Sequence, residues 1–153
     1  MLDKSNIIPV GCDHGGYELK EFLKNKLIEE GYIIHDFGTN STDSMDYPDV
    51  AHPLAKEIDE NIFVRGILIC GSGNGVCMTA NKYLHVRAAL CWNTELAKLA
   101  RLHNDANILC LPGRFIDKNE AWNAVLAFMQ TEFEGGRHIT RIEKMRNFEK
   151  DVD

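Results

Sequence analysis

The chain has 153 residues, of which 44% are hydrophobic and 26% charged, with a formal net charge of −6. These values are typical of one globular domain, here residues 1–153, and they argue against nucleic-acid binding, which needs a basic surface. No run approaches the roughly 20 apolar residues of a membrane span, and no secretory signal opens the chain, so we expect a cytoplasmic protein.

Apolar runs alternate with amphipathic segments along the whole chain. The expected strands are 7–12, 32–37, 66–70, 86–91 and 107–111, and the expected helices are 16–31, 48–61, 74–83, 93–104, 117–132 and 136–149. Pro9 suggests a strand start or a bulge, Gly31 a helix stop and Pro48 a first helical turn. Strands and helices that alternate with short connections predict an α/β protein, with a parallel sheet and helices on both of its faces.

In such a sheet, ligands bind outside the carboxyl ends of the strands. We therefore expect a site formed by Asp13 and His14 after the first strand and by residues 70–75 after the third. We also expect His103 and Asn104, at the end of helix 93–104 where the chain turns, to lie at this edge. Leu96, Leu99, Ala100 and His103 share one face of that helix.

The stretch ILICGSGNGV, residues 67–76, ends a strand with a cysteine and continues with three alternating glycines. It is not a dinucleotide fingerprint, because Val76 stands where a glycine is needed, and it is not a P-loop, because no lysine follows before Lys82. Glycines let a backbone approach a ligand, and the N–H groups of the next helix stabilise an oxyanion. The spacing alone favours equally a reactive Cys70 thiolate and a buried thiol beside a tight turn.

The stretch GGRHITR, residues 135–141, places Arg137 and Arg141 four residues apart on one helix face. Paired guanidinium groups suit a phosphate, although most such pairs are only solvated surface. Ile142, Met145 and Phe148 form an apolar stripe that should dock this helix against another surface, with a second subunit as one candidate. The last residues, 148–153, are expected to form a frayed tail.

The five cysteines include no CxxC pair, which indicates free thiols of a reducing compartment and no disulfide frame or zinc site. We expect four of them, Cys12, Cys77, Cys91 and Cys110, to lie in the core. His35, His52, His85 and His138 receive no functional role.

Several stretches together resemble the ribose-5-phosphate isomerase type B family, which also holds galactose and allose 6-phosphate isomerases. The matching stretches are GCDHGGYELK (11–20), DYPD (46–49), GILICGSGNG (66–75), ANK (80–82), RLHNDANIL (101–109), PGR (112–114) and FEGGRHITR (133–141). The resemblance implies a Rossmann-like, three-layer α/β/α sandwich with a five-stranded parallel sheet. It also implies a homodimer with shared active sites, with a tetramer as the larger alternative, and a C-terminal helix (about 136–149) that packs on the partner.

The activity implied by the resemblance is interconversion of ribose 5-phosphate and ribulose 5-phosphate, in the pentose phosphate pathway, with no metal or cofactor. Cys70 would be the base that forms a cis-enediolate, since Val76 occupies the position of the glutamate base found in other relatives. Ser72, where many relatives have threonine, would help move a proton between the sugar oxygens O1 and O2. His103 would open the sugar ring, with Asp13 assisting.

The same resemblance implies three groups of substrate contacts. The backbone of Gly71, Gly73, Asn74 and Gly75 would hold the enediolate oxygens. Asn104 and Tyr47 would contact sugar hydroxyls, and the phosphate would be held by His14, Arg114, Arg137 and Arg141.

Three alternatives stay open. The substrate could be a six-carbon sugar phosphate, such as allose 6-phosphate or galactose 6-phosphate. The chain could be a non-catalytic sugar-phosphate-binding subunit, although such a subunit should have lost its base or acid, and Cys70, Ser72 and His103 are all present. An NAD- or flavin-binding module is the third alternative.

Overall fold

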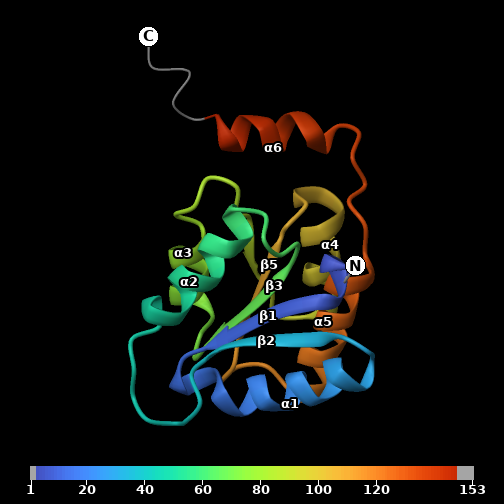
Figure 1. Ribbon diagram of the computed structural model, residues 1–153. Coiled ribbons are helices and arrows are strands. Elements are labelled where there is room, and N and C mark those ends of the chain that lie inside the picture. The colour runs from blue at the N-terminus through green and yellow to red at the C-terminus, as the bar shows by residue number, and fades with distance from the viewer. Residues whose placement is uncertain (1–2, 148–153) are drawn as a thin grey trace.

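A five-stranded parallel sheet forms the middle layer of the protein in a computed structural model that describes residues 3–147 (Figure 1). The strands are β1 (Ile7–Cys12), β2 (Ile33–Gly38), β3 (Gly66–Cys70), β4 (Ala88–Leu90) and β5 (Ile108–Pro112), in the order β2-β1-β3-β5-β4. This arrangement confirms the predicted α/β fold. The expected tail and the last residues of helix 136–149 lie outside the described residues.

Helices cover both faces of the sheet (Figure 1). One core cluster unites the sheet with α1 (Tyr17–Glu29), α4 (Thr94–Asn104) and α5 (Lys118–Gln130). A second cluster unites it with α2 (Pro48–Asp59) and α3 (Asn74–Ala80). Two short 3₁₀ helices, η1 (Lys4–Asn6) and η2 (His14–Gly16), flank β1, and α6 (His138–Arg146) lies apart from the sheet beside α4.

The central strands β3 and β5 are buried along their whole length. Ile67, Ile69 and Leu109 point to one core cluster, whereas Leu68 and Cys110 point to the other. This alternation at a period of two explains the near-continuous apolar sequence, because both faces of these strands are covered by helices. Cys70 therefore ends the most buried part of the sheet.

Turn residues lie where their backbone preferences are met. Gly31, directly after α1 and its C-cap residue, has φ +93°, and Pro48 is the first residue of α2. Pro9 precedes Val10, where pairing between β1 and β3 begins, so its missing N–H breaks no bond to that neighbour. A register shift in the β1–β2 pairing follows between Val10 and Gly11, one residue after the proline.

Three expectations need correction. The fourth strand is shorter than 86–91, and α3 ends at Ala80 rather than at residue 83. Of the residues expected together on one face of α4, Leu96 is 43% exposed whereas Ala100 is buried, as is Ala97. Small alanine side chains let α4 pack closely against the core, so the helix turns its leucine outward. Within residues 3–147, no helix is both long and apolar enough to cross a membrane.

Candidate active site

The turns after β1, β3 and β5 meet at Cys70. Cys12 lies opposite Ile69 and Cys70 lies opposite Pro112 in the sheet register. The Asp13 N–H donates to the Ile69 carbonyl at 3.1 Å, and the Gly113 N–H donates to the Cys70 carbonyl at 2.8 Å. The expectation that the ends of the first and third strands lie together at the carboxyl edge of the sheet is therefore confirmed, and the end of β5 joins them.

The glycine turn after Cys70 requires glycine at its centre. Gly73 has φ +76°, and a Cβ there would lie 2.4 Å from Leu90 Cδ1 and 3.1 Å from the Leu111 carbonyl oxygen. No side chain caps the start of α3 at this residue, although the Ser72 hydroxyl accepts the Asn74 N–H at 3.2 Å. The turn thus holds backbone N–H groups close to the end of β3.

Two long side chains lie against this turn. A Cβ at Gly75 would be 2.5 Å from Tyr47 Cζ, so the tyrosine ring rests on the backbone of the turn. A Cβ at Gly71 would be 3.3 Å from Nη1 of Arg114, whose backbone N–H also donates to the Gly71 carbonyl at 3.0 Å. Tyr47 and Arg114 are therefore brought to Cys70 from two other loops.

Asp13 and His14 form the neighbouring wall. The buried Asp13 carboxylate accepts the Gly15 N–H at 2.9 Å, and His14 Nδ1 accepts the Met45 N–H at 3.2 Å. A cavity of about 390 Å³ opens beside them, lined in part by His14, Thr42, Arg114 and Lys118. Arginine and lysine in one cavity suit a phosphate. Sequence reasoning missed Thr42 and Lys118, because neither belongs to a motif with its own signal.

The remaining thiols differ from Cys70 in their surroundings. Burial raises the pKa of Cys12 to about 11 and that of Cys91 to about 12, and it also raises the pKa of Cys110. These three are core residues, as predicted. Cys77 is only partly buried, and a hydrogen bond with the Cys110 thiol lowers its pKa. Cys70, 4% exposed, is the thiol that adjoins the glycine turn.

His103 and Asn104 lie at the opposite edge of the sheet from Cys70. They end α4, and the chain then enters β5 at Ile108, whereas Cys70 lies beside Pro112 at the far end of that strand. Five β residues span about 13 Å. The expectation that the turn after α4 shares an edge with Cys70 is wrong, because a helix between parallel strands carries the chain back to their amino ends.

A second cluster of candidate site residues surrounds His103. Its imidazole stacks on that of His138 with a centroid distance of 4.4 Å and an interplanar angle of 17°. Burial, followed by the charges of His103 and Arg137, lowers the pKa of His138. Arg137 and Arg141 are exposed at the start of α6, so the two arginines lie in the His103 cluster and not in the Cys70 cluster. His138 and Glu134 were missed, since an isolated histidine and a loop acid carry no distinctive pattern.

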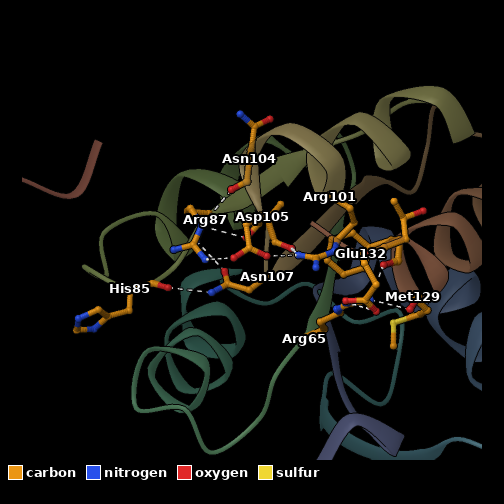
Figure 2. A network of polar contacts seen from close by, with 12 residues as sticks. Arg65, His85, Arg87, Arg101, Asn104, Asp105, Asn107, Met129 and Glu132 are labelled. Carbon is orange, nitrogen blue, oxygen red and sulfur yellow. Dashed lines mark hydrogen bonds and ion pairs between the residues drawn. The ribbon is translucent and has the colours of Figure 1, made fainter. Parts of the chain in front are cut away.

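The buried Arg101 and the partly buried Arg87 hold the turn that follows α4 (Figure 2). Arg101 Nη1 donates to the Ala106 carbonyl at 2.7 Å and pairs with Asp105 at 2.9 Å, which closes the turn after α4. Arg87 Nε donates to the carbonyls of Asn104 and Asp105 at 3.1 and 3.0 Å. The backbone that carries His103 and Asn104 is therefore held in place by several hydrogen bonds.

Comparison with known proteins gives the family. The profile of the Ribose/Galactose Isomerase family matches residues 8–145. A probable ribose-5-phosphate isomerase B of Mycoplasma pneumoniae is 43% identical over 151 residues, covering 98% of this chain and 99% of the relative. This chain belongs to the ribose/galactose isomerase family.

Solved structures of the family share its fold. Ribose-5-phosphate isomerase B of Clostridium thermocellum has a TM-score of 0.92 at 42% identity, over 96% of this chain and 99% of that one. The Mycoplasma genitalium enzyme, solved with bound ribulose-5-phosphate, has a TM-score of 0.90 at 42% identity, over 95% and 97% of the two chains. Membership of the ribose/galactose isomerase family confirms the resemblance inferred from the sequence motifs. Residues of these motifs lie in both the Cys70 cluster and the His103 cluster.

Proposed function

We propose that this member of the family is an aldose–ketose isomerase that interconverts ribose 5-phosphate and ribulose 5-phosphate, with no metal or cofactor in the reaction. The observation that carries the proposal is the arrangement at the end of β3. There a thiol, a glycine turn with a positive-φ centre and the Tyr47 ring meet beside a cavity with two cationic side chains. The relatives named ribose-5-phosphate isomerase B support the choice of a pentose phosphate.

In the proposed reaction, Cys70 acts as a thiolate and removes the proton from C2 of the open-chain aldose. The electron pair of the C–H bond forms the C1–C2 double bond of a cis-enediolate, and the carbonyl oxygen O1 becomes negative. Backbone N–H groups of residues 71–75 hold that charge, because fixed donors stabilise an oxyanion without reorganising. Ser72 passes a proton between O2 and O1, and Cys70 returns its proton to C1 to give the ketose.

The remaining candidate site residues open the sugar ring and orient the substrate. His103 protonates the ring oxygen while Asp13 accepts the proton of the anomeric hydroxyl, and Tyr47 and Asn104 contact sugar hydroxyls. The phosphate is held by His14, Arg114, Arg137 and Arg141. Because the phosphate is remote from C1 and C2, its binding free energy can be used to orient the reacting carbons.

The proposed site needs a second copy of the chain, since Cys70 and His103 lie at opposite edges of one sheet. A symmetric dimer in which each His103 cluster covers the partner's Cys70 cluster makes two complete sites. The surface beside Asn104 suits such contact. A groove of about 880 Å³ runs between α6 and the start of β4, and Ile139 and Met145 of α6 are 47% and 55% exposed.

A substrate comparison tests the proposal. Purified protein is assayed with ribose 5-phosphate, allose 6-phosphate and galactose 6-phosphate, and kcat/KM is measured for each. We expect the highest kcat/KM with ribose 5-phosphate. Turnover of a hexose phosphate alone would refute the pentose assignment, and sugar-phosphate binding without any turnover would favour a non-catalytic subunit.

A further inference from the structure

Three potential metal ligands converge in the His103 cluster. The Nε2 atoms of His103 and His138 lie 3.7 and 3.5 Å from Oε2 of Glu134. All three ligand atoms lie within 4.8 Å of one another. The Glu134 N–H also donates to the Leu102 carbonyl at 3.1 Å, which fixes the backbone of the acid beside α4.

The second observation is an unpartnered polar atom directed into this cluster. His138 is only 3% exposed, yet its Nε2 has no hydrogen-bond partner among the described residues. The Glu134 carboxylate is near enough for an ion pair but is not aligned for a hydrogen bond. A buried nitrogen without a partner costs free energy, and such an atom calls for a ligand.

We propose that His103, Glu134 and His138 form a binding site for one Zn²⁺ ion. Two imidazoles and one carboxylate are a common zinc ligand set that leaves a fourth position for water. Bonds of 2.0–2.1 Å in a tetrahedral site separate neighbouring ligand atoms by about 3.3 Å. The observed separations of 3.5 and 3.7 Å to Glu134 are therefore close to those of an occupied site.

Two features limit the affinity of this site. The positive charges of Arg137 and Arg141 act on His138 and therefore oppose a cation. The stacked imidazoles also need a tilt of the His103 ring, whose side chain is 39% exposed, before both Nε2 atoms face one ion. Zinc should thus bind only at raised concentration, as an inhibitor and not as a resident cofactor.

Inhibition is a consequence that rests on the proposed function. Zinc bound to Nε2 removes the nitrogen through which His103 would protonate the ring oxygen. Raised zinc should therefore stop ring opening, while Cys70 remains chemically intact. The proposed ligands are two imidazoles and a carboxylate, and no thiol of the same chain is among them.

A metal titration tests the site without reference to activity. Zn²⁺ binding is measured by calorimetry, and Co²⁺ absorption distinguishes nitrogen and oxygen ligands from thiolate. Two variants are compared with wild type, Glu134→Gln and His138→Gln. Glu134 is 57% exposed, so Glu134→Gln should fold normally even if His138→Gln, which changes a buried residue, does not. We expect one ion per chain, with affinity falling at least tenfold in both variants. His85→Gln is the matched control, because His85 pairs with Asp59 at 3.1 Å elsewhere on the surface, and it should bind as wild type.

Unchanged zinc affinity in Glu134→Gln, or thiolate absorption with Co²⁺, would overturn the site. In the activity assay, Zn²⁺ should inhibit wild type and His85→Gln, and Glu134→Gln should need at least tenfold more zinc for equal inhibition. Zinc that binds at Glu134 without inhibiting would support the site and contradict the role of His103. An active isomerase that binds no zinc would overturn this inference and leave the proposed function intact.

Discussion

The ring of Tyr47 rests on Gly75, where a methyl group would meet Cζ at 2.5 Å. Gly75→Ala should therefore displace the tyrosine from the glycine turn. We expect kcat/KM for ribose 5-phosphate to fall by about 100-fold, since a displacement of about 1 Å can cost that much. Because Gly75 lies in the first turn of α3 and the Tyr47 ring, 40% exposed, can move toward solvent, the melting temperature should stay close to wild type.

Met78→Ala is the control for this helix, because Met78 lies on α3 and is 67% exposed. It should leave both kcat/KM and the melting temperature close to wild type. Wild-type kcat/KM in Gly75→Ala would show that the position of Tyr47 is not needed for turnover.

The Asp36 carboxylate holds the buried Lys20 at 2.8 Å and Lys24 at 2.7 Å, beside the loop that leads to Tyr47. Burial raises the pKa of Asp36, but hydrogen bonds from Lys20, Lys24 and the Gly38 N–H outweigh it and lower the pKa from 3.8. A pKa lowered in the folded state gives stability that is present above about pH 4 and lost as pH falls further. Asp36→Asn should cost about 3 kcal/mol at pH 7.

Urea unfolding between pH 3 and pH 7 checks this prediction. The free energy of unfolding should depend less on pH in Asp36→Asn than in wild type. Asp43→Asn, which changes an exposed acid of the next loop, should keep the wild-type pH dependence. An Asp36→Asn profile parallel to wild type would contradict the role given to this ion pair.

Shared sites predict recovery of activity when two inactive variants are mixed. Cys70→Ala and His103→Gln each damage both sites of their own dimer. After subunit exchange, half of the dimers would be mixed, and each would carry one intact site, so activity should return to about a quarter of wild type. Cys70→Ala mixed with Ser72→Ala should not recover, because both changes fall in the same cluster. Failure to recover after exchange, verified by native mass spectrometry, would contradict a shared site.

The sequence predicted those parts of the fold that depend on local pattern. The apolar runs located all five strands, and Gly31 and Pro48 marked helix boundaries, because their backbone preferences act locally. The turn after Cys70 was also predictable, since alternating glycines follow a buried strand.

Long-range packing was not predictable in the same way. Helical spacing grouped Leu96 with Ala100 on one face of α4, but it did not tell that Ala100 is buried while Leu96 is exposed, because the close approach permitted by Ala97 leaves no pattern. His103 was placed at the wrong edge, since motif order along the chain does not tell which end of the sheet a turn reaches. The pairing of His138 with Glu134 depends on how α6 docks, and no local signal encodes that.

The most direct test of the central claim is the fate of the C2 hydrogen in Cys70→Ala. Ribose 5-phosphate deuterated at C2 is incubated with each protein, and both loss of the deuteron and formation of ribulose 5-phosphate are followed by NMR. We expect both rates to fall by about 10³-fold, as loss of a general base predicts, while calorimetry shows sugar-phosphate binding close to wild type. Isomerisation and deuteron loss at wild-type rates in Cys70→Ala would contradict a cysteine base.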